Sequence, residues 1–182
     1  MSWLLWAARV HIPEFVRRQS LQELLALTAE AFGCKAPQTE MLSCAQLLHE
    51  YALFSRDCAV ERIQRGCDLA TVKGRLYRSA YRLGQRLRAA FGVATTQDVM
   101  TAGRLLYRAL GIDFLGTAEG TVIISKCFFS RYYSSPVCEI ISALDEGVLA
   151  GLSGGGRLSF CQRITAGHSC CRARFAAREG TP

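Results

Sequence analysis

The pattern of apolar residues changes once along this chain, near Gly111. Before this glycine, apolar residues recur at helical spacing, in long segments that begin at capping residues and end at glycines. After it come short runs rich in β-branched and aromatic residues, which are typical of strands. Helices that precede an antiparallel sheet are characteristic of the α+β class, so the sequence predicts an α+β fold.

Four helices are expected before Gly111, each from its own start and stop signals. Ser20 and Glu23 form a capping-box pattern, in which a serine and an acidic residue three positions later satisfy each other's backbone groups. We therefore expect a helix from Ser20 to Gly33. The remaining three are expected from Ser43 with Gln46 to Gly66, from Asp68 to Gly92, and from Thr95 or Thr96 to Gly111.

The last third predicts the order β-β-α-β-β. The runs IDFL and TVIISKCFF flank the turn GTAEG, a hairpin pattern. Ser135 and Pro136 then fit the N-cap and first position of a helix that ends at three glycines, 154–156. Two further strand-like runs, RLSFCQRIT and CCRARFA, close the chain. We expect an N-terminal helical segment over 1–67 and an α+β domain over 68–178.

Composition excludes some classes of function. Half of the residues are hydrophobic, so the chain is not expected to be disordered. The net charge of +7 comes almost entirely from arginines that are spread along the helices, so nucleic acid is not an expected partner. No apolar run approaches the roughly 18 residues that span a bilayer, and the start lacks a positive n-region. We expect a cytoplasmic protein in which residues 1–10 pack onto the helical half or onto a second protomer.

Four segments carry a resemblance that extends over residues 71–175. They are RLYRSAYRLGQRLRAAFG, LYRALGIDFLG, PVCEIISALDEGVLAGLSG and the closing QRITAGHSCCRARF, in which Gly167 is followed four residues later by Cys171. Together they resemble 4-vinyl-reductase-type ligand-binding domains and the small subunits of the TRAPP vesicle-tethering complex. They also resemble the L-2-amino-thiazoline-4-carboxylic acid hydrolases. The resemblance implies a small-molecule pocket, in a sensor or in a hydrolase of small heterocycles.

Cys138 is the candidate nucleophile. If Ser135 is the N-cap, the thiol lies in the first helical turn, where free amide groups and the helix dipole favour the thiolate and lower its pKa. Asp145 lies on the same helical face, and His168 is the histidine of the C-terminal half. In the hydrolase interpretation Cys138 attacks the substrate, His168 carries the proton and Asp145 orients the imidazole. The alternative is that this cysteine is a packing residue.

Several cysteines are expected on neighbouring elements of the sheet domain. Cys127 ends a predicted strand, Cys138 begins the next helix, and Cys161 and Cys171 lie in the last two strands. Adjacent residues of a strand point to opposite faces, so only one of Cys170 and Cys171 can join such a site. A zinc ion or an iron–sulfur cluster is one hypothesis for this set. The alternative is that small thiols fill the core.

Other side chains flank the expected pocket between the sheet and the Cys138 helix. Arg131 and Arg163 can present charge to an anionic ligand, and Tyr132 and Tyr133 can form a wall. The first hypothesis is therefore a small-molecule-binding domain, in its catalytic form a hydrolase of a thiazoline-like heterocycle. The two alternatives are a cysteine-ligated metal protein and a non-enzymatic adaptor that forms a homodimer through apolar helices.

Overall fold

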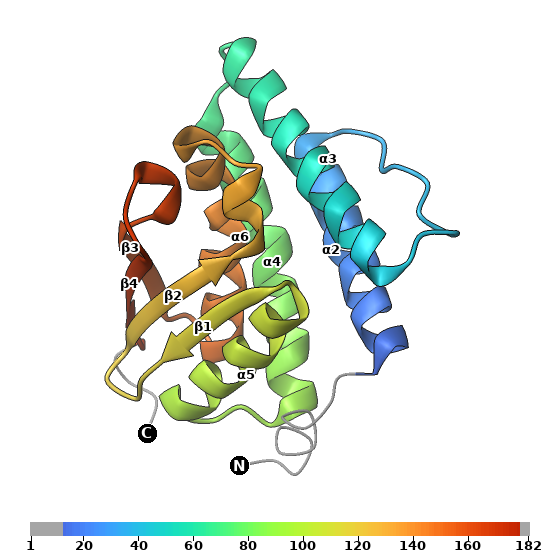
Figure 1. Ribbon diagram of the computed structural model, residues 1–182. Coiled ribbons are helices and arrows are strands. Elements are labelled where there is room, and N and C mark those ends of the chain that lie inside the picture. Colours follow the sequence, from blue (N-terminus) through green and yellow to red (C-terminus); the bar gives the residue numbers. More distant parts are fainter. Residues whose placement is uncertain (1–12, 179–182) are drawn as a thin grey trace.

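A computed structural model of the chain describes residues 13–178 and confirms the α+β class (Figure 1). Its helices come first and its antiparallel strands follow, in the predicted β-β-α-β-β order. The helices are α2 (Glu14–Phe32), α3 (Cys44–Gln64), α4 (Leu69–Phe91), α5 (Thr96–Ala109) and α6 (Ser135–Ser153). The strands are β1 (Ile112–Gly116), β2 (Thr121–Cys127), β3 (Arg157–Gln162) and β4 (Cys171–Ala176), with the short 3₁₀ turns η1 (Phe128–Arg131) and η2 (Ile164–Ala166). The apolar stretch 1–10 lies outside the described residues.

The capping signals locate most helix starts. Ser43 accepts a hydrogen bond from the amide of Gln46, whose side chain accepts from the amide of Ser43 in return. Thr95 and Asp98 form the same reciprocal pair at the start of α5, and the side chain of Asp68 caps α4. These bonds satisfy amides that have no partner within the helix, so the chain turns into a helix at these points.

Two of the predicted starts are wrong. The first helix begins at Glu14, so Ser20 lies inside α2, where its hydroxyl donates to the carbonyl of Val16 at 2.9 Å. A serine inside a helix commonly bonds back to the preceding turn in this way. The N-cap of α6 is Ser134 and not Ser135, which moves Cys138 one position further into the helix.

The four strands form one antiparallel sheet in the order β1-β2-β4-β3. Alternate residues point to opposite faces, and one face is buried on every strand. Ile112, Val122, Leu158 and Phe175 belong to that buried face. Helices α5 and α6 cover it, and Figure 1 shows α4 beside α6 and the α2–α3 pair on the far side of these two helices from the sheet.

Helices α4 and α6 run side by side in the same direction with almost no side chain between them. A methyl group on Gly84 would lie 2.9 Å from the Cα of Gly151 and would overlap the carbonyl oxygen of Val148. A methyl group on Gly147 would overlap the carbonyl oxygen of Tyr77. Glycines thus let the two backbones touch, which maximises dispersion contacts along the pair.

Among residues 13–178, none of the helices has the length and hydropathy of a membrane-spanning helix.

The α4–α6 contact yields a stability prediction. Gly151→Ala should lower the free energy of unfolding by about 2 kcal/mol or more, because the added methyl overlaps the backbone of α4 and forces the helices apart. Gly74→Ala is the matched control. Its methyl group would meet only the end of the Arg78 side chain at 3.5 Å, so this variant should gain about 0.5–1 kcal/mol from helix propensity. Urea unfolding of both variants measures the difference, and equal effects would contradict the backbone contact.

Candidate functional site

A cavity of about 540 Å³ lies between the helices and the buried face of the sheet. Its walls come from all five helices, α2 to α6, from the four strands, and from the segment around η1. Most of the lining is aliphatic or aromatic. Apolar lining residues include Leu21, Leu24, Leu83, Leu87, Leu105, Ile112, Ile124, Phe129, Ile141, Leu144 and Val148. A molecule bound here would meet hydrocarbon over most of its surface.

Asp145 supplies a carboxyl group to this apolar space. The side chain is half-buried and lines the cavity. The Tyr107 hydroxyl donates a hydrogen bond to Oδ1 at 2.7 Å. Burial raises the pKa of Asp145 from 3.8 to about 6, although the Tyr107 hydrogen bond and the nearby Arg163 favour the ionised form. Burial, followed by the charge of Asp145, raises the pKa of Tyr107 well above its usual value.

Arg163 supplies a cation to the same part of the cavity. Its Nη2 donates to the hydroxyl of Ser142 at 2.8 Å, and the guanidinium lies over the ring of Phe160, 4.4 Å from the ring centre. The Nε of Arg163 is buried and has no hydrogen-bond partner among the described residues. The hydroxyl of Thr165, two residues further on, is also buried and has no hydrogen-bond partner among the described residues. Both side chains lie close enough to the Cys138 thiol to oppose the rise in its pKa. Donors that are buried without a partner are uncommon in folded proteins, and they point to a missing acceptor.

Three thiols line the cavity, those of Cys127, Cys138 and Cys171. Burial raises the pKa of Cys127 to about 12 and raises the pKa of Cys138 and Cys171 as well. For Cys138 this direction agrees with the packing alternative and is opposite to the lowered pKa expected of a nucleophile in the first helical turn. Because Ser134 is the N-cap, the amide of Cys138 is already bonded to the Ser134 carbonyl at 2.9 Å, and burial disfavours the thiolate.

The structure brings together only part of the proposed catalytic set. Cys138 and Asp145 both line the cavity, two turns apart on α6. His168 is exposed in the turn after η2 and is not a lining residue. The geometry therefore supplies a thiol and a carboxyl group to the cavity, without the imidazole.

The metal hypothesis finds no site. Cys161 is exposed, and its thiol donates to the carbonyl of Arg172 at 3.3 Å, away from the three cavity thiols. Across residues 13–178, no group of three or more histidine, cysteine, aspartate or glutamate side chains is placed to hold a metal ion. None of the nine cysteines is in a disulfide.

Of the four predicted ligand-contacting residues, two line the cavity. These are Tyr133, whose hydroxyl lies 2.5 Å from that of Ser55, and Arg163. Arg131 is exposed, and the hydroxyl of Tyr132 lies 2.9 Å from Nδ1 of His49, outside the cavity.

The sequence analysis missed Tyr107 and the apolar walls contributed by α2, α4 and α5. Tyr107 occupies an ordinary position in an amphipathic helix, so no local signal separates it from a packing residue. A useful signal was Asp145 itself, a carboxylate within the apolar run SALDEGVLAGL, because a buried acid needs a partner.

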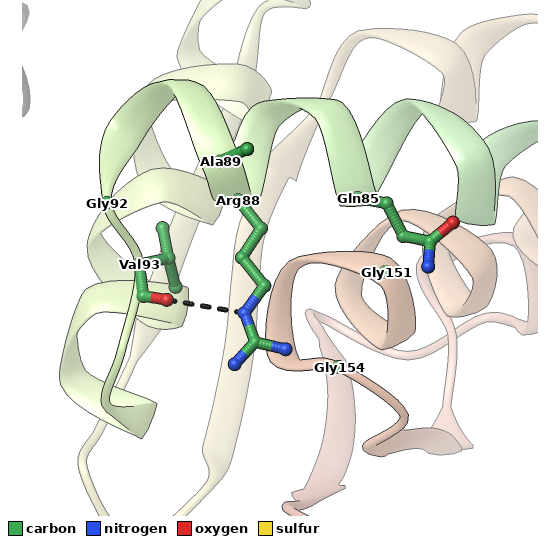
Figure 2. Close-up of a pocket in the computed structure, with 7 residues that line it drawn as sticks. All are labelled: Gln85, Arg88, Ala89, Gly92, Val93, Gly151 and Gly154. Carbon is green, nitrogen blue, oxygen red and sulfur yellow. Dashed lines mark hydrogen bonds between the residues drawn. The ribbon is translucent and has the colours of Figure 1, made fainter.

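A second hollow, of about 390 Å³, lies where α4 and α6 end (Figure 2). Its lining includes Gln85, Arg88 and the two left-handed C-cap glycines, Gly92 and Gly154. Nε of Arg88 donates to the carbonyl of Val93 at 3.4 Å. A cation at two helix C-termini is favourable for the helix dipoles, so Arg88 has a structural role here.

The similarity of this chain to known proteins is structural. No family model matches the chain, and no curated protein matches it. A solved structure of trafficking protein particle complex subunit 3 from Naegleria fowleri, covalently bound to palmitic acid, is similar with a TM-score of 0.52. The similarity covers 74% of this chain and 97% of that one, at 12% identity. The fold is TRAPP-subunit-like. The 4-vinyl-reductase and thiazoline-hydrolase resemblances receive no support from these comparisons.

Asp145 yields a prediction of pH-dependent stability. Its folded-state pKa of about 6 lies above the ordinary 3.8, so the folded state holds the proton more tightly. The free energy of unfolding therefore falls as pH rises from about 4 to about 6, by on the order of 3 kcal/mol, and stays lower above that range. Asp145→Asn removes this cost while an amide oxygen can still accept from Tyr107.

We expect Asp145→Asn to be more stable than the parent by about 1–3 kcal/mol near pH 8, with the difference shrinking towards pH 4. Urea unfolding across this pH range measures the effect. Asp113→Asn, which changes an exposed aspartate of β1, is the control and should leave the pH profile unchanged. A gain that does not depend on pH would mean that Asp145 is not the titrating group.

Proposed function

We propose that this protein binds a long apolar molecule, such as the acyl chain of a lipid, in the cavity between the helices and the sheet. The observation that carries the proposal is the cavity itself, whose 540 Å³ are lined mainly by aliphatic and aromatic side chains. Its volume lies within the range of about 300–1,000 Å³ that is typical of small-molecule sites.

The apolar lining of the cavity favours a hydrocarbon occupant over water. Cavities in protein cores cost about 24 cal/mol for each Å³ that is left unfilled, so even part of this volume would cost several kcal/mol. Water is a poor filler, since a buried water needs two to four polar partners and most of this lining offers none. A flexible hydrocarbon chain fills such a space and restores the lost contacts.

The structural neighbour supports the same proposal. The trafficking complex subunit that shares this fold carries a covalently bound palmitic acid. In the present chain, the three cavity thiols would be the residues available for a covalent link. The raised pKa of each thiol favours non-covalent binding, because the thiolate is the reactive form. The catalytic roles of Cys138, His168 and Asp145 remain predictions, and binding requires none of them.

Acyl-chain binding is tested by displacement of a fluorescent fatty acid from the full-length protein. Leu83→Trp replaces an isobutyl group of α4 with an indole ring that takes up part of the cavity, and it should weaken binding about tenfold or more. Leu115→Trp enlarges an exposed residue of β1 that does not line the cavity, and it should bind like the parent. The same assay is run on a chain without residues 1–12, because Pro13, the residue that follows this segment, lines the cavity. Probe binding that is absent from both chains would refute the proposal.

A second candidate is a non-enzymatic adaptor that forms a homodimer. It is favoured by the fold similarity to a subunit of a multiprotein particle. Light scattering at micromolar concentration should then give twice the mass of one chain, which is 20.0 kDa. A monomer mass over the whole concentration range would contradict this candidate and leave the binding proposal unaffected.

A further inference from the structure

The polar end of the cavity contains two opposite charges that do not pair with each other. Asp145 and Arg163 both line the cavity, yet the ion pairs within residues 13–178 do not include this combination. Asp145 is held by Tyr107, and Arg163 is held by Ser142. Buried opposite charges normally satisfy each other, because an unpaired charge in an apolar site is costly.

The positions on α6 define the gap between these charges. Ser142 and Asp145 are three residues apart, so their side chains lie on the same face of the helix, about one turn from each other. The guanidinium of Arg163 is fixed at Ser142 by its 2.8 Å hydrogen bond. The carboxyl of Asp145 is fixed one turn further on. A group with only a few atoms can bridge a gap of this length.

The two side chains require opposite hydrogen-bonding partners. A guanidinium can only donate, and Nε of Arg163 still lacks an acceptor. An ionised carboxylate can only accept, and Asp145 has a described hydrogen bond on Oδ1. A ligand between them must therefore present an acceptor to Arg163 and a donor to Asp145.

We propose that the cavity selects an acyl-chain ligand with a neutral head group that both donates and accepts hydrogen bonds, an amide above all. The amide oxygen accepts from Nε of Arg163, and the amide N–H donates to Oδ2 of Asp145. This inference rests on the proposed function, since the hydrocarbon chain occupies the apolar part of the cavity. It adds the chemical class of the head group.

A free carboxylate fits this end less well. It would satisfy Arg163, but it would place a second negative charge beside Asp145, and like charges at such short range repel. The third charged lining residue, Arg17, does not compensate at this position, because it comes from α2 and its Nε already donates to the carbonyl of Ala109 at 2.8 Å. A carboxylate would therefore bind together with a proton taken up by Asp145.

Protonation of Asp145 depends on groups from every element around it. Those that interact with it are Tyr107 of α5, Tyr51 of α3, Cys127 of β2, Cys138 and Glu146 of α6, Cys171 of β4, and Arg163. Arg163 is the cation among them, and it favours the ionised form. At neutral pH Asp145 thus accepts from a ligand, and in mild acid it becomes able to donate.

The experiment compares three ligands with the same hydrocarbon chain, dodecanamide, methyl dodecanoate and dodecanoic acid, by displacement of a fluorescent fatty acid from the full-length protein. Near pH 7.5 the amide should bind about tenfold or more tightly than the ester, which lacks a donor, and more tightly than the acid. The affinity for the acid should rise as pH falls towards about 5.5, since binding and proton uptake by Asp145 are linked.

Variants assign the preference to the two residues. Asp145→Asn should remove the pH dependence and make the acid bind more tightly than it does to the parent. Arg163→Gln should remove the advantage of the amide over the ester. Arg157→Gln, an exposed arginine of β3 that does not line the cavity, is the control and should behave like the parent. Thermal unfolding checks that each variant is folded, and the three-ligand comparison on the parent needs no variant.

The outcomes separate the two proposals. If the ester and the amide both bind with affinities within about twofold of each other, the head-group inference is overturned and the acyl-chain proposal stands. If the acid binds most tightly near pH 7.5, the inference is likewise overturned. If the probe binds and none of the three ligands displaces it, the head-group inference is overturned. If the probe does not bind, the acyl-chain proposal fails and the inference fails with it.

Discussion

The direct backbone contact between α4 and α6 is the constraint on which the rest of the structure depends. Gly84, Gly147 and Gly151 bring the two helices to a separation that no larger residue permits. Helix α6 then packs on the sheet, and the α2–α3 pair packs on the other side, α2 on α4 and α3 on α6. The side of α6 that carries Cys138, Ser142 and Asp145 is turned to the cavity, so the same contact that holds the fold together also aims the polar groups.

The cavity and its charges are costly features in a chain of this size. An apolar space of 540 Å³ lacks the dispersion contacts of a packed core, and Asp145 is enclosed with a raised pKa. Buried thiols and a tyrosine surround this carboxyl, with Arg163 held one helical turn away from it. Features of a folded chain that lower its stability commonly coincide with a binding site. Here the apolar cavity, the carboxyl of raised pKa and the thiols lie together.

Much of the fold was predictable because its signals are local. Ser43, Asp68, Thr95 and the glycines that end the helices act within one turn, and the strand runs are short and distinct. The site was predictable only in part. Asp145 and Arg163 were singled out, but the partner of Asp145 lies 38 residues away on another helix. Non-local pairs such as Tyr107 with Asp145 leave no periodic trace. The N-cap of α6 was misassigned by one residue, since Ser134 and Ser135 are equivalent as a sequence signal.

The wall of the cavity joins residues that are synthesised far apart in time. It includes Pro13, just before α2, and Cys171 of β4, so every element between them must be synthesised before the cavity can close. Helices α2 and α3 are synthesised before α4 and α6, the helices that cover their apolar surfaces in the folded chain. Strand β4 is the last of the four strands in chain order and pairs with both β2 and β3, so the cavity closes only when β4 docks between them.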